Sequence, residues 1–342
     1  MSLAAVLVAG LVAGCSPSSF LARRMIDAPN RVPGFLKPEG RVLLRWPAGL
    51  LERFPSGTNV VGHPPAGLRW VIVEPADFRT ETRSEPRDRQ RTNRVTFRFS
   101  FQLPAAGLPP PKPAVGTAFL LHGYGVDLET LLPLGVFLAE AGWRSVLVDL
   151  RGHGSSGGRQ VSFGVRETED LRELRAALAQ EGRVGGPCVA VGHSLGAALA
   201  LRWAAQDPEV EGAVALGPFA EFVPAALRLR SEYAKWVPRG WVRRAAEKVP
   251  GLLGVERANL DPVSVVQNRA VHALLIASAA DVITPPEDAA VLESTLGPRG
   301  ELLIVGGATH ETLPYAFGQH GETLRQWLSA LGTRSMAGRS KD

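Results

Sequence analysis

In the pentapeptide Gly192-His193-Ser194-Leu195-Gly196, glycines two residues before and after the serine give the G-x-S-x-G spacing of a catalytic nucleophile. An apolar run, residues 188–191, precedes it, and an alanine-rich segment, residues 197–205, follows it. A strand that turns sharply into a helix at G-x-S-x-G strains the serine backbone and lifts the hydroxyl above the sheet edge. The two glycines keep neighbouring chain clear of the turn. We predict that Ser194 is a nucleophile rather than an ordinary turn serine.

A serine hydroxyl needs a base within hydrogen-bond reach, and the base needs an acid that orients it. The predicted base is His310, which follows Gly306 and Gly307 just past an apolar run. The predicted acid is Asp281, at the end of the preceding apolar run. The gap between them leaves room for one helix and one strand.

Other residues compete for these two roles. Glu221 and Asp288 are the alternative acids, and His320 is the alternative base. His320 falls inside or near the last predicted helix, which makes it the weaker choice. We expect His193 and His153 to be structural.

An oxyanion hole requires two backbone N–H groups directed at the same point. Leu195 supplies one of them at the start of the helix that follows the serine. The second is expected from the loop His122-Gly123-Tyr124-Gly125, and we assign it to Tyr124. His122 is expected to brace this loop.

The elements that position these residues alternate between apolar strands and helices from residue 115 onward. The expected strands are residues 117–121, 145–150, 188–191, 212–216, 273–278 and 302–305. Leucines at i, i+3 and i+7 predict a helix over residues 166–180. This alternation favours an α/β fold: a mostly parallel sheet of about eight strands flanked by helices. Ligand sites in such sheets lie beyond the carboxyl ends of the strands, where these motifs fall.

The rest of the chain divides by composition. Residues 15–66 are expected to form a tether and irregular packing, and residues 67–331 the main domain. Strand-like runs at 68–74 and 94–103 predict an antiparallel hairpin across a charged turn. Residues 219–260 are predicted to be a small helical cap, and residues 332–342 a disordered tail.

Aromatic residues of the cap have two possible roles. They form the core of the cap itself, or they line an apolar substrate pocket. The candidates for the pocket are Tyr124, Phe219, Phe222, Tyr233 and Trp236.

Charge and cysteine content limit the partners. The net charge of +5 is matched by residues 79–94 (+3) and 334–342 (+2), so the remainder is neutral. No aromatic residues interleave with the basic ones, so nucleic-acid binding is not expected. Cys188 is expected to be a buried thiol. The chain has no zinc-binding spacing, and neither a metal nor another cofactor is expected.

The first fifteen residues resemble the signal sequence of a bacterial lipoprotein. An apolar stretch of about ten residues, too short to span a bilayer, ends in Val12-Ala13-Gly14-Cys15. The resemblance implies that residues 1–14 are removed and that Cys15 carries fatty acyl chains such as palmitate. It departs from the pattern because no Lys or Arg precedes the apolar stretch. It implies the bacterial cell envelope, at the outer membrane or periplasmic face. The alternative is an apolar N-terminal element with an incidental cysteine.

Several motifs together resemble the α/β-hydrolase superfamily. They are the loop at 122–125, Asp149-Leu150-Arg151-Gly152-His153-Gly154-Ser155-Ser156-Gly157, the Ser194 pentapeptide, Asp281 and His310. The segment from Asp149 is similar to the branch of serine aminopeptidases and monoacylglycerol lipases. The resemblance covers residues 115–331 and implies a Ser-His-Asp triad.

This resemblance implies a hydrolase of carboxylic esters, of the carboxylesterase or lipase type. The apolar cap and the lipid anchor favour acylglycerol- or lipid-like substrates. A serine peptidase, an aminopeptidase or a thioesterase is the alternative enzyme. A non-catalytic, lipid-binding lipoprotein on the same scaffold is the alternative of another class.

Overall fold

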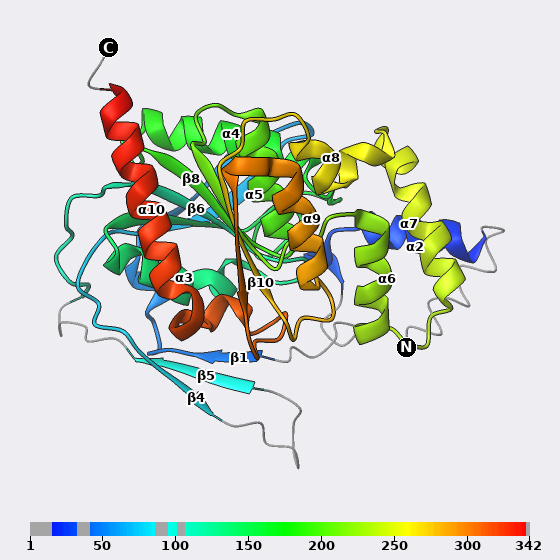
Figure 1. Cartoon of the computed structure of the whole chain (residues 1–342), viewed down its shortest axis with the longest axis horizontal. Coiled ribbons are helices and arrows are strands. Elements are labelled where there is room, and N and C mark those ends of the chain that lie inside the picture. Colours follow the sequence, from blue (N-terminus) through cyan, green and yellow to red (C-terminus); the bar gives the residue numbers. More distant parts are fainter. Residues whose placement is uncertain (1–15, 33–41, 86–94, 101–106, 340–342) are drawn as a thin grey trace.

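The structure is a computed structural model that describes residues 16–32, 42–85, 95–100 and 107–339. Its centre is an eight-stranded sheet in the order β11-β10-β9-β8-β6-β7-β3-β2 (Figure 1). Strands β6 to β11 are mutually parallel, whereas β3 and β2 are antiparallel to their neighbours. The strands are β2 (Ser56–Val61), β3 (Ala66–Val73), β6 (Gly116–Leu121), β7 (Trp143–Val148), β8 (Cys188–His193), β9 (Gly212–Leu216), β10 (Ala273–Ser278) and β11 (Gly300–Val305). The predicted α/β architecture is confirmed.

Helices bury apolar side chains on both faces of the sheet. One core includes side chains of α4 (Val165–Gln180), α5 (Leu195–Gln206), α8 (Pro262–Val266) and α9 (Pro286–Leu296). The opposite core includes side chains of α3 (Leu132–Glu140) and α10 (Phe317–Arg339). The central strands β6, β8, β9 and β10 are accordingly almost entirely buried, as covering on both faces requires.

Helix α4 packs on the sheet through the leucines whose spacing predicted it. Leu171, Leu174 and Leu178 lie on one face of the helix and are completely buried against the sheet. Burying one leucine side chain contributes about 1.5–3 kcal/mol, so this stripe fixes the helix on the sheet.

The cap consists of α6 (Phe222–Tyr233) and α7 (Arg239–Leu253), followed by a short 3₁₀ turn. Phe222, Val223 and Leu227 of α6 pack with Ala246 and Val249 of α7 in a small separate core. Residues 219–260 are thus helical, as predicted.

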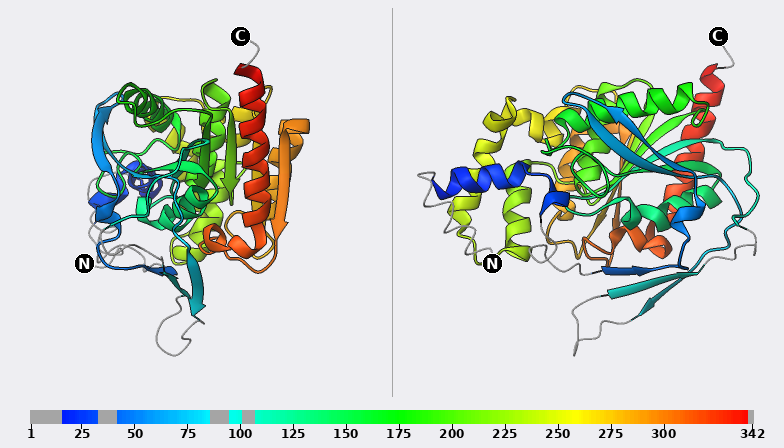
Figure 2. Two further views of the ribbon diagram at one scale, coloured as in Figure 1. Left: turned by 90° about the vertical axis from the view of Figure 1, so that its left-hand side faces the viewer. Right: turned by 180° about the vertical axis from the view of Figure 1, so that it is seen from behind.

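Two parts of the predicted organisation are wrong. The segment assigned to an irregular tether contains α2 (Pro17–Ile26), which lies alongside α7 of the cap (Figure 2), and it also contributes β2 to the main sheet. Helix α2 begins at a Ser16 N-cap followed by proline, and Ile26 enters the core of the cap. The predicted tail from residue 332 instead continues α10 to Arg339. Residues 1–14 and Cys15 lie outside the described residues.

The predicted hairpin between residues 68–74 and 94–103 does not form. Strand β3 pairs with β2 and β7 because its buried side chains belong in the main sheet. The alternating segment forms β5 (Val95–Ser100) in a second sheet, paired with β4 (Glu81–Glu85) and β1 (Val42–Arg45). Its aromatic face, Phe97 and Phe99, packs against Tyr315 instead of against β3.

Candidate active site

Ser194 occupies a sharp turn between β8 and α5. Its backbone has φ 56° and ψ −114°, a strained combination for a residue with a side chain. A Cβ atom at Gly192 would lie 1.9 Å from the carbonyl oxygen of Gly196, and one at Gly196 would lie 1.8 Å from that of Leu121. Only glycine fits at these two positions, which gives the G-x-S-x-G spacing its physical cause.

The structure brings together the three residues predicted as a triad, each from a loop at the carboxyl edge of the sheet. Ser194 Oγ lies 2.9 Å from His310 Nε2, and His310 Nδ1 lies 2.7 Å from Asp281 Oδ2. Ser194 follows β8, Asp281 follows β10 and His310 follows β11. Asp281 and His310 are buried, so this chain of hydrogen bonds is largely screened from water.

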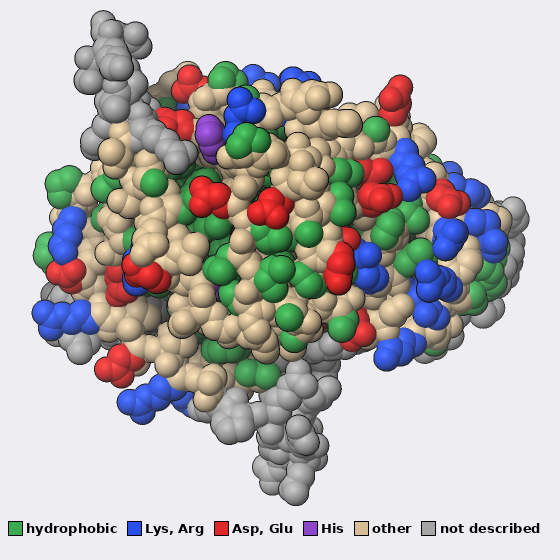
Figure 3. Space-filling model, viewed as in Figure 1, with side chains coloured by type: hydrophobic (Ala, Val, Ile, Leu, Met, Phe, Trp, Pro, Cys, Tyr) green, Lys and Arg blue, Asp and Glu red, His purple; other side chains and the backbone are tan. Residues whose placement is uncertain are grey.

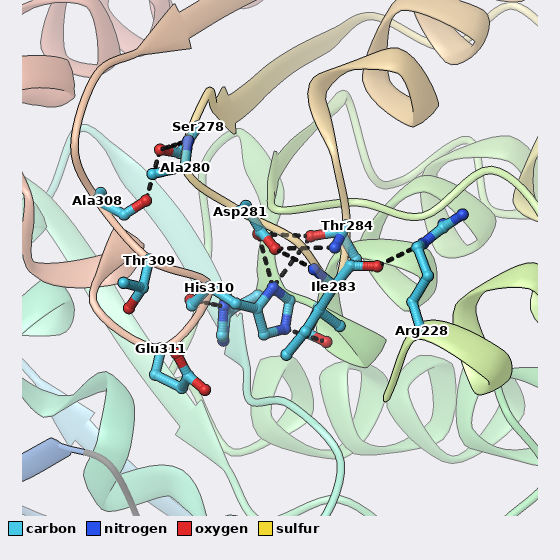
Figure 4. Close-up of polar contacts among 12 residues, drawn as sticks. Arg228, Ser278, Ala280, Asp281, Ile283, Thr284, Ala308, Thr309, His310 and Glu311 are labelled. Carbon is cyan, nitrogen blue, oxygen red and sulfur yellow. Dashed lines mark hydrogen bonds and ion pairs between the residues drawn. The ribbon is translucent and has the colours of Figure 1, made fainter. Parts of the chain in front are cut away.

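Asp281 is held by four hydrogen-bond donors (Figure 4). Oδ1 accepts the backbone N–H groups of Ile283 and Thr284, each at 2.8 Å, while Oδ2 accepts the Thr284 hydroxyl and His310 Nδ1–H. Burial alone would raise the pKa of Asp281, but the hydrogen bond and charge of His310, together with Thr284, bring this pKa below its usual value. Asp281 therefore stays ionised and fixes the proton of His310 on Nδ1.

The rival residues are engaged elsewhere. Glu221 forms an ion pair with Arg257 at 3.5 Å, and Asp288 pairs with Arg228. His320 lies in α10, completely buried, with Nε2 bonded to the carbonyl oxygen of Leu313. Neither alternative acid is the hydrogen-bond partner of His310 Nδ1.

His193 braces the base. Its Nε2 is 2.9 Å from the carbonyl oxygen of His310, and the centroids of the two rings are 4.8 Å apart. Burial and the neighbouring His310 lower the pKa of His193 to about 3, so its ring is neutral and donates to this carbonyl. His153 likewise contacts a carbonyl, that of Arg151, at 3.0 Å. Both contacts fit the structural roles predicted for these histidines.

The predicted oxyanion loop lies directly beside the serine. A Cβ atom at Gly123 would lie 3.5 Å from Ser194 Cβ, so the loop passes within van der Waals distance of the elbow. Within the part of the chain that the structure describes, no hydrogen bond ties up the backbone N–H of Leu195 or of Tyr124. Both N–H groups are therefore available to an oxyanion.

His122 holds this loop in place. Its Nδ1 is 2.8 Å from the carbonyl oxygen of Gly123, and its Nε2 accepts the backbone N–H of Leu150 at 3.0 Å. Burial lowers the pKa of His122 to about 4, so the ring is neutral with its proton on Nδ1. Asp149 adds a second tie by accepting the backbone N–H groups of Leu128 and Ser155, both at 2.8 Å.

The arginine of the same motif anchors the neighbouring helix. Arg151 Nε and Nη2 form a bidentate pair with Asp170 of α4 at 2.7 and 2.5 Å, and Nη1 donates to the carbonyl oxygen of Pro64. Both side chains are buried. This pair joins the loop after β7, α4 and the turn between β2 and β3, which explains an arginine in this motif without any catalytic role.

The five predicted pocket residues lie in different surroundings. Phe219 and Phe222 are buried in the core of the cap, the other role considered for them. The hydroxyl of Tyr233 donates to Glu311, beside His310, and Trp236 is 53% exposed in the connection between α6 and α7. Only Tyr124 lies in the loop next to Ser194.

Two residues of the site escaped sequence reasoning. The hydroxyl of Thr284 donates to Asp281 Oδ2 at 2.7 Å and lies 3.0 Å from His310 Nδ1. Phe163 stacks on Tyr124 with 6.0 Å between ring centroids and packs on Phe222 at 4.6 Å, joining the oxyanion loop to the cap. A threonine three residues after the acid was a readable signal, because Asp side chains often cap the turn they begin. Nothing in the sequence marked Phe163.

The described residues, 16–32, 42–85, 95–100 and 107–339, offer little other chemistry. They contain no group of three or more His, Cys, Asp or Glu side chains placed to hold a metal ion, and no helix long and apolar enough to cross a membrane. Cys188 is a free, buried thiol whose pKa burial raises to about 12, which makes it a poor nucleophile.

The sheet order, the strained elbow and the Ser-His-Asp chain are the features of an α/β-hydrolase. A model of the family described as serine aminopeptidase, S33, matches residues 112–278. The uncharacterized protein YqkD of Bacillus subtilis is 30% identical over 227 residues, which cover 64% of this chain and 72% of that protein.

Solved structures share the fold. The esterase Pf2001 of Pyrococcus furiosus superimposes with a TM-score of 0.59 at 19% identity, covering 87% of this chain and 97% of that one. The α/β hydrolase GrgF from Penicillium sp. sh18 does so with a TM-score of 0.54 at 20% identity, covering 83% and 99%. The chain belongs to the α/β-hydrolase superfamily of serine hydrolases.

Proposed function

We propose that this protein hydrolyses carboxylic esters through an acyl-enzyme on Ser194. The observation that carries the proposal is the continuous chain from Ser194 Oγ through His310 to the ionised Asp281. His310 Nε2 accepts the serine proton as Oγ attacks the acyl carbonyl, and then returns that proton to the departing alkoxide. Water, deprotonated by the same nitrogen, then releases the acid and restores the serine.

The developing oxyanion is held by the N–H groups of Leu195 and Tyr124. Preorganised donors of this kind contribute more to the transition state than to the bound ester, because the negative charge develops only on attack. Removing one donor from such a hole typically raises the barrier by about 3–4 kcal/mol. His122 serves this step indirectly, by fixing the loop that carries Tyr124.

We favour esters with an apolar acyl group, of the acylglycerol or lipid type. Support comes from the aromatic contacts that join Tyr124 of the oxyanion loop through Phe163 to Phe222 of the cap, and from the description of Pf2001 as an esterase. The same proposal includes a lipid anchor on Cys15 and a place at the outer membrane or periplasmic face of a bacterial envelope. These features would hold the enzyme close to lipid substrates.

A peptidase is the second candidate, favoured by the S33 family name and by one structural feature. A cavity of about 290 Å³ adjoins the segment after Tyr124, and Asp127 and Glu129 line it. Carboxylates at that place suit the ammonium group of a peptide N-terminus. Arg69 lines the same cavity, however, and offsets part of their charge.

Substrate series on the full-length chain test the choice between these classes. We expect turnover of p-nitrophenyl esters from acetate to palmitate, with the best chain length separating a small-ester esterase from a lipase. Aminoacyl p-nitroanilides and acyl-CoA thioesters report the peptidase and thioesterase alternatives. Ser194→Ala is the matched control, expected to lose about 10³-fold or more. Turnover of anilides but not of esters would reverse our preference, and no turnover of any substrate would favour a lipid-binding role.

A further inference from the structure

A second cavity lies in the cap, between α6 and α7. Its volume is about 340 Å³, comparable to that of small-molecule sites. Four arginines surround it, with one glutamate, one serine and three apolar residues. The lining residues are Val223, Pro224, Leu227, Arg228 and Ser231 from α6, Arg239, Arg243 and Glu247 from α7, and Arg257 beyond them.

The arginines are not equivalent. Arg228 pairs with Asp288 and donates from Nε to the carbonyl oxygen of Ile283 at 2.7 Å, and Arg257 pairs with Glu221 and Asp261. Over the described ranges, neither Arg239 nor Arg243 forms an ion pair or a hydrogen bond through its side chain. These two are exposed and one helical turn apart on α7, so both guanidinium groups face one region.

The charge of the cap supports an anionic ligand. Residues 219–260 contain eight Lys and Arg against four Asp and Glu, a net charge of +4. The chain outside residues 79–94 and 334–342 has no net charge as a whole, and that sum hides the concentration of positive charge in the cap. Lys and Arg side chains gather over the cap, on the right-hand side of the molecule in Figure 3.

The other wall of the cavity is apolar. Val223, Pro224 and Leu227 form it, and Val223 and Leu227 also belong to the core of the cap, which makes this wall rigid. A bare inorganic anion would leave that wall unused. A ligand with an anionic head and a short apolar or glycerol-like body would contact both walls.

We propose that this cavity binds a phosphate ester, held at its phosphate by Arg239 and Arg243. One guanidinium group can donate two parallel N–H groups to two phosphate oxygens, and two guanidinium groups without other partners match the charge of a phosphate dianion. The Ser231 hydroxyl donates to the carbonyl oxygen of Leu227 at 3.0 Å, so its oxygen and the Glu247 carboxylate are the acceptors available to hydroxyls of the ester body. The ester is either a soluble phosphomonoester or the headgroup of phosphatidic acid, because both present a terminal phosphomonoester.

Arg239 and Arg243 are the residues to change. Arg228 is unsuitable because it bonds to Ile283, whose N–H holds Asp281, so its replacement would disturb the triad. Arg299 is the matched control, an exposed arginine directly before β11, at the amino edge of the sheet. The two cap arginines contact no residue of the triad, so ester hydrolysis should continue when both become glutamine.

The soluble arm is calorimetric titration of the full-length chain with sn-glycerol 3-phosphate, with glycerol and acetate as comparison ligands. Wild type and Arg299→Gln should bind the phosphate ester equally. Arg239→Gln/Arg243→Gln should bind at least about tenfold more weakly, because charge-assisted hydrogen bonds are lost. Acetate binding as tightly as the phosphate ester would overturn the assignment.

The lipid arm is co-sedimentation with phosphatidylcholine vesicles, with and without phosphatidic acid. Binding to the anionic vesicles alone, lost in the double variant, would identify the lipid headgroup as the ligand. Binding that survives in the double variant, with no arginine-dependent titration of glycerol phosphate, would refute the site. Ester hydrolysis is measured alongside: its absence from wild type would defeat the proposed function but would not alter either binding result.

Discussion

Replacing Asp281 with asparagine tests the proton arrangement of the triad without changing its shape. In the wild type, Oδ1 accepts two backbone N–H groups, from Ile283 and Thr284. The asparagine carbonyl must take that place, because an amide NH₂ there would face two donors. The NH₂ group is therefore turned toward His310 Nδ1. The histidine must then accept at Nδ1 and carry its proton on Nε2, where it no longer accepts the proton of Ser194.

The expected loss follows from this tautomer change. A triad with its base in the wrong tautomer loses about 10⁴-fold in kcat, which corresponds to about 5.5 kcal/mol of transition-state stabilisation. We expect Asp281→Asn to reduce kcat/KM for a p-nitrophenyl ester by about 10³–10⁴-fold. Circular dichroism should show an unchanged fold, since the backbone donors remain satisfied.

Asp288→Asn is the matched control, because it removes the charge of the rival acid. Asp288 contacts no member of the triad, and the asparagine oxygen still accepts the hydrogen bond of Arg228, so Arg228 stays bonded to Ile283. The value of kcat/KM should therefore change by less than about tenfold, or 1.4 kcal/mol. The reasoning is refuted if Asp281→Asn keeps more than about one tenth of the activity, or if Asp288→Asn is the variant that inactivates the enzyme.

Three further predictions concern the scaffold. Gly196→Ala should abolish ester hydrolysis and lower the free energy of unfolding in urea by at least about 1–3 kcal/mol, because the added Cβ would lie 1.8 Å from the carbonyl oxygen of Leu121. Gly251→Ala in α7, where no atom beyond the adjoining helix lies within 4 Å of the added Cβ, should be neutral or slightly stabilising. Asp170→Ala leaves the buried Arg151 guanidinium without its ion-pair partner and should lower the free energy of unfolding by about 3–5 kcal/mol. The double variant Arg151→Met/Asp170→Leu should lower it by less, and equal losses would contradict this prediction. The Asp281 pKa is lowered on folding, so its ionisation stabilises the protein above its usual pKa of 3.8, and that contribution disappears as the pH falls through the folded pKa. The wild-type Tm should accordingly fall more steeply than that of Asp281→Asn below pH 3.8, and parallel curves would argue against the shift.

The active-site residues were predictable because each role has a local signature. Ser194 is marked by two glycines whose necessity the backbone distances explain, and Asp281 and His310 both follow apolar strands. Parallel strands in one sheet end at the same edge, so residues far apart in sequence become neighbours there. Thr284 was within reach of the same reasoning, and was missed.

The organisation of the N-terminal part was harder to predict from the sequence, because the partners of its strands and of α2 are set by tertiary contacts. The alternation of β5 indicates a strand but does not identify its partners, which are β1 and β4 rather than the predicted β3. Helix α2 has only ten residues, which is too short for a stable isolated helix, and its stability depends on packing against α7. The cap cavity was hidden for a similar reason, since the basic residues around it cancel in a sum over the chain.

The central claim is that Ser194 is the nucleophile and that His310 activates it. Treating the full-length chain with a fluorophosphonate and measuring its intact and peptide masses tests this most directly. The account predicts a single adduct on Ser194, formed together with loss of ester hydrolysis, absent from Ser194→Ala and strongly slowed in His310→Ala. An adduct on another residue, or undiminished hydrolysis by Ser194→Ala, would contradict it.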